Sequence, residues 1–168
     1  MFLIVQVLTV CLVAVGMSLA LAHALELPGK MRLDRDTYLA MQPIYYPGFT
    51  VGAGVGEAGG ILATAVLLIL TPRASNAFPW TLAALVFLVA MHLAYWVVTH
   101  PVNRFWLRDF QLKGFSGGFF RFDPLDRSAP LDREDAWKRL RNRWEYSHVI
   151  RAVLAGVSLV CLVIAVAL

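Results

Sequence analysis

Four stretches of the chain are almost wholly apolar, and polar segments of different lengths separate them. The apolar stretches cover about residues 2–25, 52–71, 79–100 and 147–168. A membrane-spanning helix needs roughly 20 mostly apolar residues, and each stretch reaches that length. The pattern therefore predicts an all-α, up-down-up-down bundle of four transmembrane helices, which forms one domain over residues 1–168.

Composition excludes a soluble globular domain. Hydrophobic residues make up 59% of the 168 residues, and the mean hydropathy is +0.65. A soluble domain of this size could not cover so much apolar surface with polar side chains. The lipid bilayer is therefore the first partner that the sequence predicts.

The distribution of Lys and Arg predicts the orientation of the bundle. The segment after the first apolar stretch carries three of them, and ten more lie between residues 104 and 143, whereas the second and third stretches are joined by a loop with only Arg73. By the positive-inside rule, both long loops are cytoplasmic and both termini are outside, and we expect a bacterial inner membrane. No nucleic-acid recognition motif is present, so the net charge of +4 is interpreted as a topology signal.

The long segment from Asn103 to Asp132 mixes phenylalanine and tryptophan with Arg and Lys. Such a composition is typical of the lipid headgroup region, which predicts a long cytoplasmic interfacial loop between the third and fourth helices. Gly117–Gly118 could serve as a hinge for a lid, and a fixed interfacial anchor is the alternative.

Glycines recur every four residues at the start of the second stretch, at Gly52, Gly56 and Gly60. No Lys-Ser or Lys-Thr follows them, which excludes a phosphate-binding loop. Small residues at this spacing allow two helix backbones to approach closely in lipid. The glycines therefore predict a tight helix–helix seam.

Polar residues gather near one end of every predicted helix, and up-and-down threading brings these ends to one side of the membrane. An ionisable residue within a span is a functional-site hypothesis by default, since burying it costs on the order of 2.5–3.5 kcal/mol at mid-bilayer. We therefore expect Glu57 and His148 to lie in direct contact or to be joined by one water. The whole cluster consists of His23, Glu26, Glu57, His100, Asn103, Glu145, His148 and Arg151.

Part of this cluster has the composition of a metal site. Glu145 and His148 form a Glu-x-x-His pair, and His23 with Glu26 forms the reverse pair. In ferritin-like bundles, such pairs and further glutamates hold two metal ions. The pattern predicts one or two iron or manganese ions, and haem between two of the histidines at 23, 100 and 148 is the alternative. The predicted metal ligands are His23, Glu26, Glu57, Glu145 and His148.

Two short motifs resemble a known family. One is Pro-x-Asn after the third stretch, at Pro101 and Asn103, and the other is Trp-x-x-x-His-x-x-Arg, formed by Trp144, His148 and Arg151. The chain resembles the small four-helix membrane proteins grouped with anthrone oxygenases, and the resemblance covers most of its length. It implies oxygenation of a lipophilic aromatic molecule such as a polyketide anthrone, with or without a metal.

Three classes of function remain open. The first is a membrane oxidoreductase or oxygenase acting on an aromatic or quinone-like molecule, the second is a haem-binding electron-transfer module, and the third is a non-catalytic membrane subunit with a buried polar network. The sequence also leaves monomer and homo-oligomer open. For the enzyme, the predicted catalytic residues are His148, Arg151, His100, Asn103 and Trp144.

Overall fold

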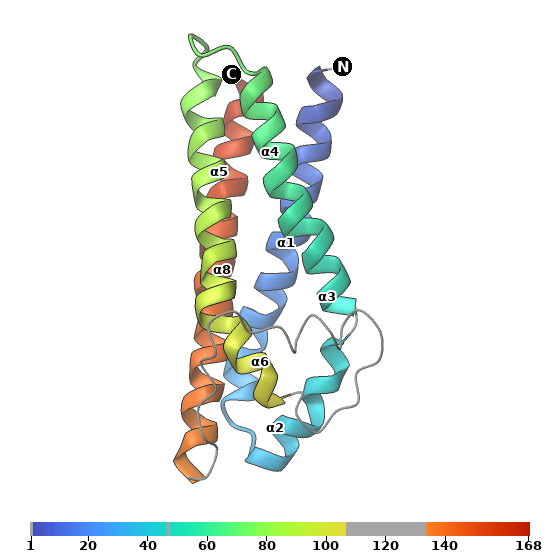
Figure 1. Ribbon diagram of the computed structural model, residues 1–168, viewed down its shortest axis with the longest axis vertical. Coiled ribbons are helices and arrows are strands. Elements are labelled where there is room, and N and C mark those ends of the chain that lie inside the picture. The colour runs from blue at the N-terminus through green and yellow to red at the C-terminus, as the bar shows by residue number, and fades with distance from the viewer. Residues whose placement is uncertain (1, 47, 107–133) are drawn as a thin grey trace.

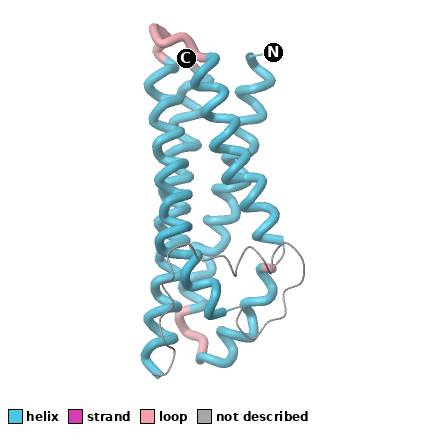
Figure 2. Tube along the Cα trace, in the orientation of Figure 1, coloured by secondary structure: helices cyan, strands magenta, loops and turns pink. Residues whose placement is uncertain are grey.

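The computed structural model describes residues 2–46, 48–106 and 134–168, except the side chains of residues 104, 105, 134 and 135. Within these ranges the regular secondary structure is helical, and four long helices run up and down beside one another (Figures 1 and 2). Both termini lie at the same end of the bundle (Figure 1). The predicted all-α four-helix bundle is confirmed. Most of the predicted interfacial loop, with Gly117–Gly118, lies outside the described residues.

The first long helix is α1 (Phe2–Lys30), and the short helices α2 (Arg35–Met41) and η1 (Gln42–Tyr45) follow it. The second consists of α3 (Gly48–Ala53), the π-helical segment η2 (Gly54–Ala58) and α4 (Gly59–Leu70). The third consists of α5 (Ala77–Ala94), the π-helical segment η3 (Tyr95–Thr99) and α6 (His100–Trp106), and the fourth is α8 (Glu134–Ala167).

All four long helices have the length and apolar composition needed to cross a membrane. The spanning segments are Phe2–Lys30, Gly48–Leu70, Ala77–Asn103 and Ala136–Ala167. Large aliphatic side chains such as Ile4, Ile69 and Val160 are exposed on the outer surface, which suits contact with lipid tails. These features are those of an integral membrane protein.

The helices pack in a ring. Helix α8 packs against α1 and α5, and α4 packs against the same two helices from the other side. An aliphatic cluster that includes Val13, Leu88 and Leu162 fills the interior near the termini. An aromatic cluster that includes Tyr38, Trp106 and Trp144 fills the opposite end, which we call the site end.

Two of the long helices continue through a proline and so extend beyond the apolar stretches predicted from the sequence. Helix α1 continues through Pro28 to Lys30, and the third long helix continues through Pro101 to Trp106. Pro28 lies two residues from the end of α1, so its missing N–H affects only the last turn. Pro101 directly follows the π-helical segment η3, where the backbone already departs from the α-helical pattern, since the N–H of His100 donates to the carbonyl oxygen of Tyr95. As a result, Lys30 is held on the helix.

The predicted glycine seam is confirmed where α1 crosses η2. A Cβ added to Gly56 would lie 2.5 Å from the backbone nitrogen of Gly16 and 2.8 Å from its Cα. The two backbones are therefore in direct contact. Gly16, which sequence reasoning did not single out, supplies the other half of the seam.

We expect Gly56→Ala to lower the stability of the protein by about 1–3 kcal/mol, because the added methyl meets backbone that cannot move aside. The matched control is Gly54→Ala, since a Cβ at Gly54 meets no atom within 4 Å. Thermal unfolding in detergent compares the two. Equal melting temperatures for both variants would contradict the seam.

Candidate active site

A cavity of about 320 Å³ lies at the site end, between α1, the α3–η2 segment, the α5–η3–α6 segment and α8. Its wall is largely aromatic, and titratable groups from all four long helices reach it. The aromatic lining residues are Tyr45, Tyr46, Phe49, Tyr95, Trp96 and Trp144. The other polar lining residues include His23, Glu57, His92, Asn103, His148 and Arg151.

Arg151 lies between Glu57 and His148, the two residues that were expected from the sequence to be in contact. Its guanidinium forms a buried ion pair with Oε1 of Glu57, and Nη1 lies 3.2 Å from Nδ1 of His148. The expected contact between Glu57 and His148 was direct or through one water, and the structure instead connects the two through Arg151. Because a guanidinium can only donate hydrogen bonds, Nδ1 of His148 must accept one. Neutral His148 then carries its proton on Nε2, which is buried and has no hydrogen-bond partner.

His92 approaches the same carboxylate from α5. The indole nitrogen of Trp96 donates a 3.0 Å hydrogen bond to Nε2 of His92, so the proton of the neutral imidazole lies on Nδ1. That atom is 3.6 Å from Oε2 of Glu57. The buried carboxylate of Glu57 is thus paired with a guanidinium, and the imidazole of His92 lies nearby at more than hydrogen-bond distance.

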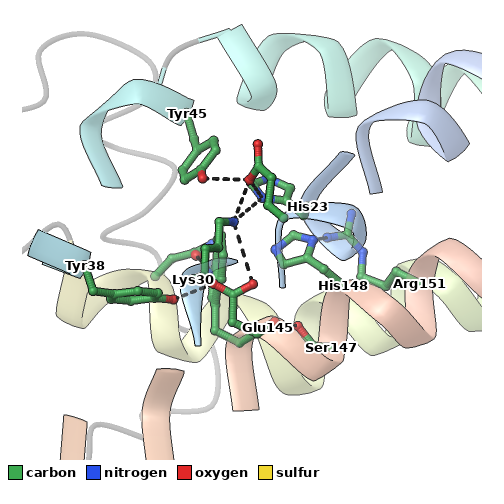
Figure 3. Close-up of polar contacts among 11 residues, drawn as sticks. His23, Lys30, Tyr38, Tyr45, Glu145, Ser147, His148 and Arg151 are labelled. Carbon is green, nitrogen blue, oxygen red and sulfur yellow. Dashed lines mark hydrogen bonds and ion pairs between the residues drawn. The ribbon is translucent and has the colours of Figure 1, made fainter. Parts of the chain in front are cut away.

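A second charged group surrounds Lys30, whose side chain is 2% exposed (Figure 3). Nζ of Lys30 lies 2.8 Å from Oε2 of Glu26, 3.7 Å from Oε2 of Glu145 and 3.3 Å from Nδ1 of His23. The rings of His23 and His148 contact each other at a centroid distance of 4.1 Å, tilted by 33°. The two charged groups are therefore connected through a histidine pair.

Two tyrosines complete the group around Lys30. Tyr38 donates a 2.9 Å hydrogen bond to Glu145, and Tyr45 donates a 2.8 Å hydrogen bond to Glu26. Burial, and then the Glu145 carboxylate, raise the pKa of Tyr38. Burial, and then the hydrogen bond to Glu26, raise the pKa of Tyr45. Both phenols consequently stay protonated donors at neutral pH.

Asn103 and Trp144 are positioned by each other. The indole N–H of Trp144 donates a 2.7 Å hydrogen bond to Oδ1 of Asn103, and the hydroxyl of Tyr46 lies 3.4 Å from the same oxygen. Both Asn103 and Trp144 line the cavity. His100 is buried behind the wall, with Nδ1 3.1 Å from the hydroxyl of Tyr95, and is not among the cavity-lining residues.

The residues predicted as metal ligands do not fit a metal well. Within the described ranges, no group of three or more His, Cys, Asp or Glu side chains is placed to hold an ion. Lys30 lies among Glu26, Glu145 and His23, and Arg151 lies between Glu57 and His148. These side-chain cations already occupy the positions that a metal would take. Metal binding therefore stays a prediction that the geometry does not favour.

The alternative of a haem between two histidines also fits poorly. His23 and His148 pack ring against ring, so they cannot ligate one iron from its opposite faces. Nδ1 of each ring faces a side chain that donates, which fixes the proton on Nε2, the nitrogen that would have to be free to bind iron.

We expect added Fe(II) or Mn(II) to leave the melting temperature of the detergent-purified protein unchanged, and a chelator to leave it unchanged as well. A metal that binds the folded state would stabilise it by RT ln(1 + [L]/Kd), where [L] is the metal concentration, and would thereby raise the melting temperature. A metal-dependent rise that disappears in Glu145→Gln would restore the metal site predicted from the sequence.

The geometry defines a small integral membrane protein with an aromatic cavity and a carboxylate–guanidinium–imidazole group in its wall. The chain belongs to the anthrone oxygenase family, because the sequence profile of that family matches residues 41–161. The match confirms the resemblance drawn from the two short motifs. No curated protein and no solved structure matches the chain.

Sequence reasoning missed several residues of the site, above all Lys30, Tyr38 and Tyr45. A usable signal existed for Lys30, since Glu26 and Lys30 are four residues apart and such pairs meet on one helix face. The predicted apolar stretch ends at about residue 25, whereas α1 continues to Lys30, so the pair was not considered. Nothing in the sequence pattern points to the two tyrosines, which lie on the short helices after α1.

Proposed function

We propose that the protein is a membrane oxygenase that converts the activated methylene of a lipophilic, anthrone-like aromatic molecule to a carbonyl, with dioxygen as the oxidant. The observation that carries this proposal is a buried carboxylate, Glu57, in the wall of an aromatic cavity and paired with Arg151. The family match supports the class of reaction. The Lys and Arg distribution supports a cytoplasmic site end.

The cavity suits a flat aromatic molecule. Its volume of about 320 Å³ lies at the lower end of the usual range for ligand pockets. Aromatic side chains line it from several sides and favour stacked or edge-on contacts with a ring system. The polar lining residues, which include Glu57, Asn103 and His148, can orient the ring system.

The chemistry needs a base and a group that stabilises an anion. An anthrone methylene lies between two aromatic rings and is conjugated to the carbonyl, so removing one proton gives an aromatic anion with its charge on oxygen. We assign the proton acceptor to Glu57. When Glu57 takes the proton its own charge disappears, and Arg151 is then free to balance the new oxyanion.

The following steps consume one dioxygen and balance without another reductant. The anion transfers an electron to dioxygen, and the two radicals combine to form a C–O bond. Glu57 returns its proton to give a hydroperoxide. Removal of the second methylene proton breaks the O–O bond, which leaves the carbonyl and hydroxide, and that proton converts the hydroxide to water. The sum is R₂CH₂ + O₂ → R₂CO + H₂O.

His148 is assigned a donor role. Its protonated Nε2 cannot accept a proton, and the nitrogen is buried without a partner. An unmade hydrogen bond of this kind costs about 1–3 kcal/mol, which a substrate oxygen could recover. Arg151 fixes this tautomer through Nδ1. We therefore assign His148, one of the predicted catalytic residues, the role of an oxyanion donor.

The test is turnover of a dihydroxyanthrone by purified protein in lipid nanodiscs. The rate is measured as dioxygen uptake, and the product is analysed by mass spectrometry after reaction with isotopically labelled dioxygen. We expect one labelled oxygen in the anthraquinone. His148→Leu should lose most of the rate, and Tyr146→Phe, an exposed position on the same helix, should keep it. A rate no higher than spontaneous oxidation with empty nanodiscs would refute the proposal.

A further inference from the structure

We propose that the substrate enters the cavity sideways from the hydrocarbon core of the bilayer, through an opening between η2 and the α5–η3 segment. We call this opening the portal. It is bordered by Gly54, Ala58, His92 and Trp96. The identity of the natural substrate rests on the proposed function. The route is a property of the cavity, and it can be tested without turnover.

The exposure of the cavity wall places the opening on this side. Gly54 and Ala58 line the cavity and are exposed, and among the described lining residues they alone are. His92 and Trp96, which line the cavity from α5 and η3, are half-buried. On α1, the lining residues Ala20 and His23 are buried, and Leu19 is half-buried. The exposed part of the described wall is therefore on η2, beside the half-buried residues of the third long helix, and we place the opening there.

The depth of the portal places it in lipid. Its residues lie within Gly48–Leu70 and Ala77–Asn103, two of the four segments able to span a membrane. Ala58 follows the first residue of its segment by ten positions, which corresponds to about 15 Å along a helix. This is about half of a hydrocarbon core of roughly 30 Å. A molecule at the opening is consequently surrounded by acyl chains.

The glycine at the portal differs from its neighbours in the seam. A Cβ at Gly56 would collide with the backbone of Gly16, and one at Gly52 would lie 2.8 Å from Cδ1 of Leu19. At Gly54 it would meet no atom within 4 Å. Helix packing does not require a glycine there, so its missing side chain leaves the opening free. Both segments beside the opening are π-helical, a local form frequent at functional sites.

The portal can be tested with an apolar photoreactive probe. Protein in nanodiscs is irradiated with adamantyl diazirine dissolved in the lipid, and insertions at the buried cavity residues Tyr45 and Trp144 are mapped by mass spectrometry. We expect clear labelling in the unaltered protein and at least a tenfold loss in Gly54→Phe. Ala58→Phe gives a second closure. Val55→Phe is the matched control, because Val55 is an exposed η2 residue outside the cavity wall.

Each outcome decides the proposal. Loss of labelling in both closure variants, with labelling kept in Val55→Phe, supports lateral entry. Equal labelling in the closure variants and in the unaltered protein overturns it. In folded closure variants, kcat/KM for the dihydroxyanthrone should fall by a similar factor. If the unaltered protein labels as expected but turns over no anthrone, the proposed function fails and the portal stands.

Discussion

Replacing Glu57 with glutamine is expected to lower kcat for anthrone oxygenation by about 10²–10⁴-fold, the usual contribution of a positioned acid–base group. Glutamine keeps the size of the side chain and an oxygen that can accept from Arg151, but it cannot take a proton. The variant therefore cannot carry out the first step of the reaction, although the volume of the side chain in the cavity wall is unchanged. Dioxygen uptake gives the rate, and the melting temperature establishes that the variant is folded.

A spectrum without dioxygen separates this role from a structural one. Under anaerobic conditions the unaltered protein should accumulate the coloured anthrone anion, because deprotonation needs no oxidant. Glu57→Gln should bind the same anthrone, seen as quenching of tryptophan fluorescence, without forming the anion. Asp36→Asn, at an exposed carboxylate on α2, is the control and should form it normally. Anion formation by Glu57→Gln would assign the base elsewhere.

Much of the fold could be predicted because the bilayer restricts what a chain can do. Backbone groups in lipid must satisfy one another, so a long apolar stretch has few alternatives to a helix. The stretches that contain Glu57 and His148 fall largely within two of the spanning helices, and the depth at which each helix carries its polar residues follows from the rise per residue. That argument sufficed to bring Glu57, His148 and Arg151 to one site.

What the sequence could not supply was the partner of each group. Glu26 and Glu145 were interpreted as metal ligands because acidic and histidine spacings on helices look the same whether a metal or a lysine neutralises them. The position of Lys30 among them depends on α1 continuing beyond Pro28. The protons of His23 and His148 depend in turn on which nitrogen faces a cation. Such choices are made by tertiary contacts, which periodicity does not encode.

Arg151→Met is expected to destabilise the folded protein by about 3–5 kcal/mol, because it leaves the carboxylate of Glu57 buried without its cation. Both side chains are largely excluded from solvent, at 4% and 7% exposure, so bulk water solvates the remaining carboxylate poorly. Unfolding in mixed micelles measures the loss. Arg143→Met is the matched control: Arg143 lies on the same helix, is exposed, and donates to the backbone oxygen of Val97.

Combining Arg151→Met with Glu57→Gln should recover most of that stability, because removing both charges of a buried pair is far less costly than removing one. The double-mutant cycle then gives the coupling between the two side chains. Turnover should not recover, since both the proton acceptor and the balancing cation are gone. A double variant as unstable as Arg151→Met would show that Arg151 stabilises the bundle chiefly through His148. Recovery of stability without activity would instead show that the bundle does not need this buried ion pair, which leaves the chemistry as the reason for placing it there.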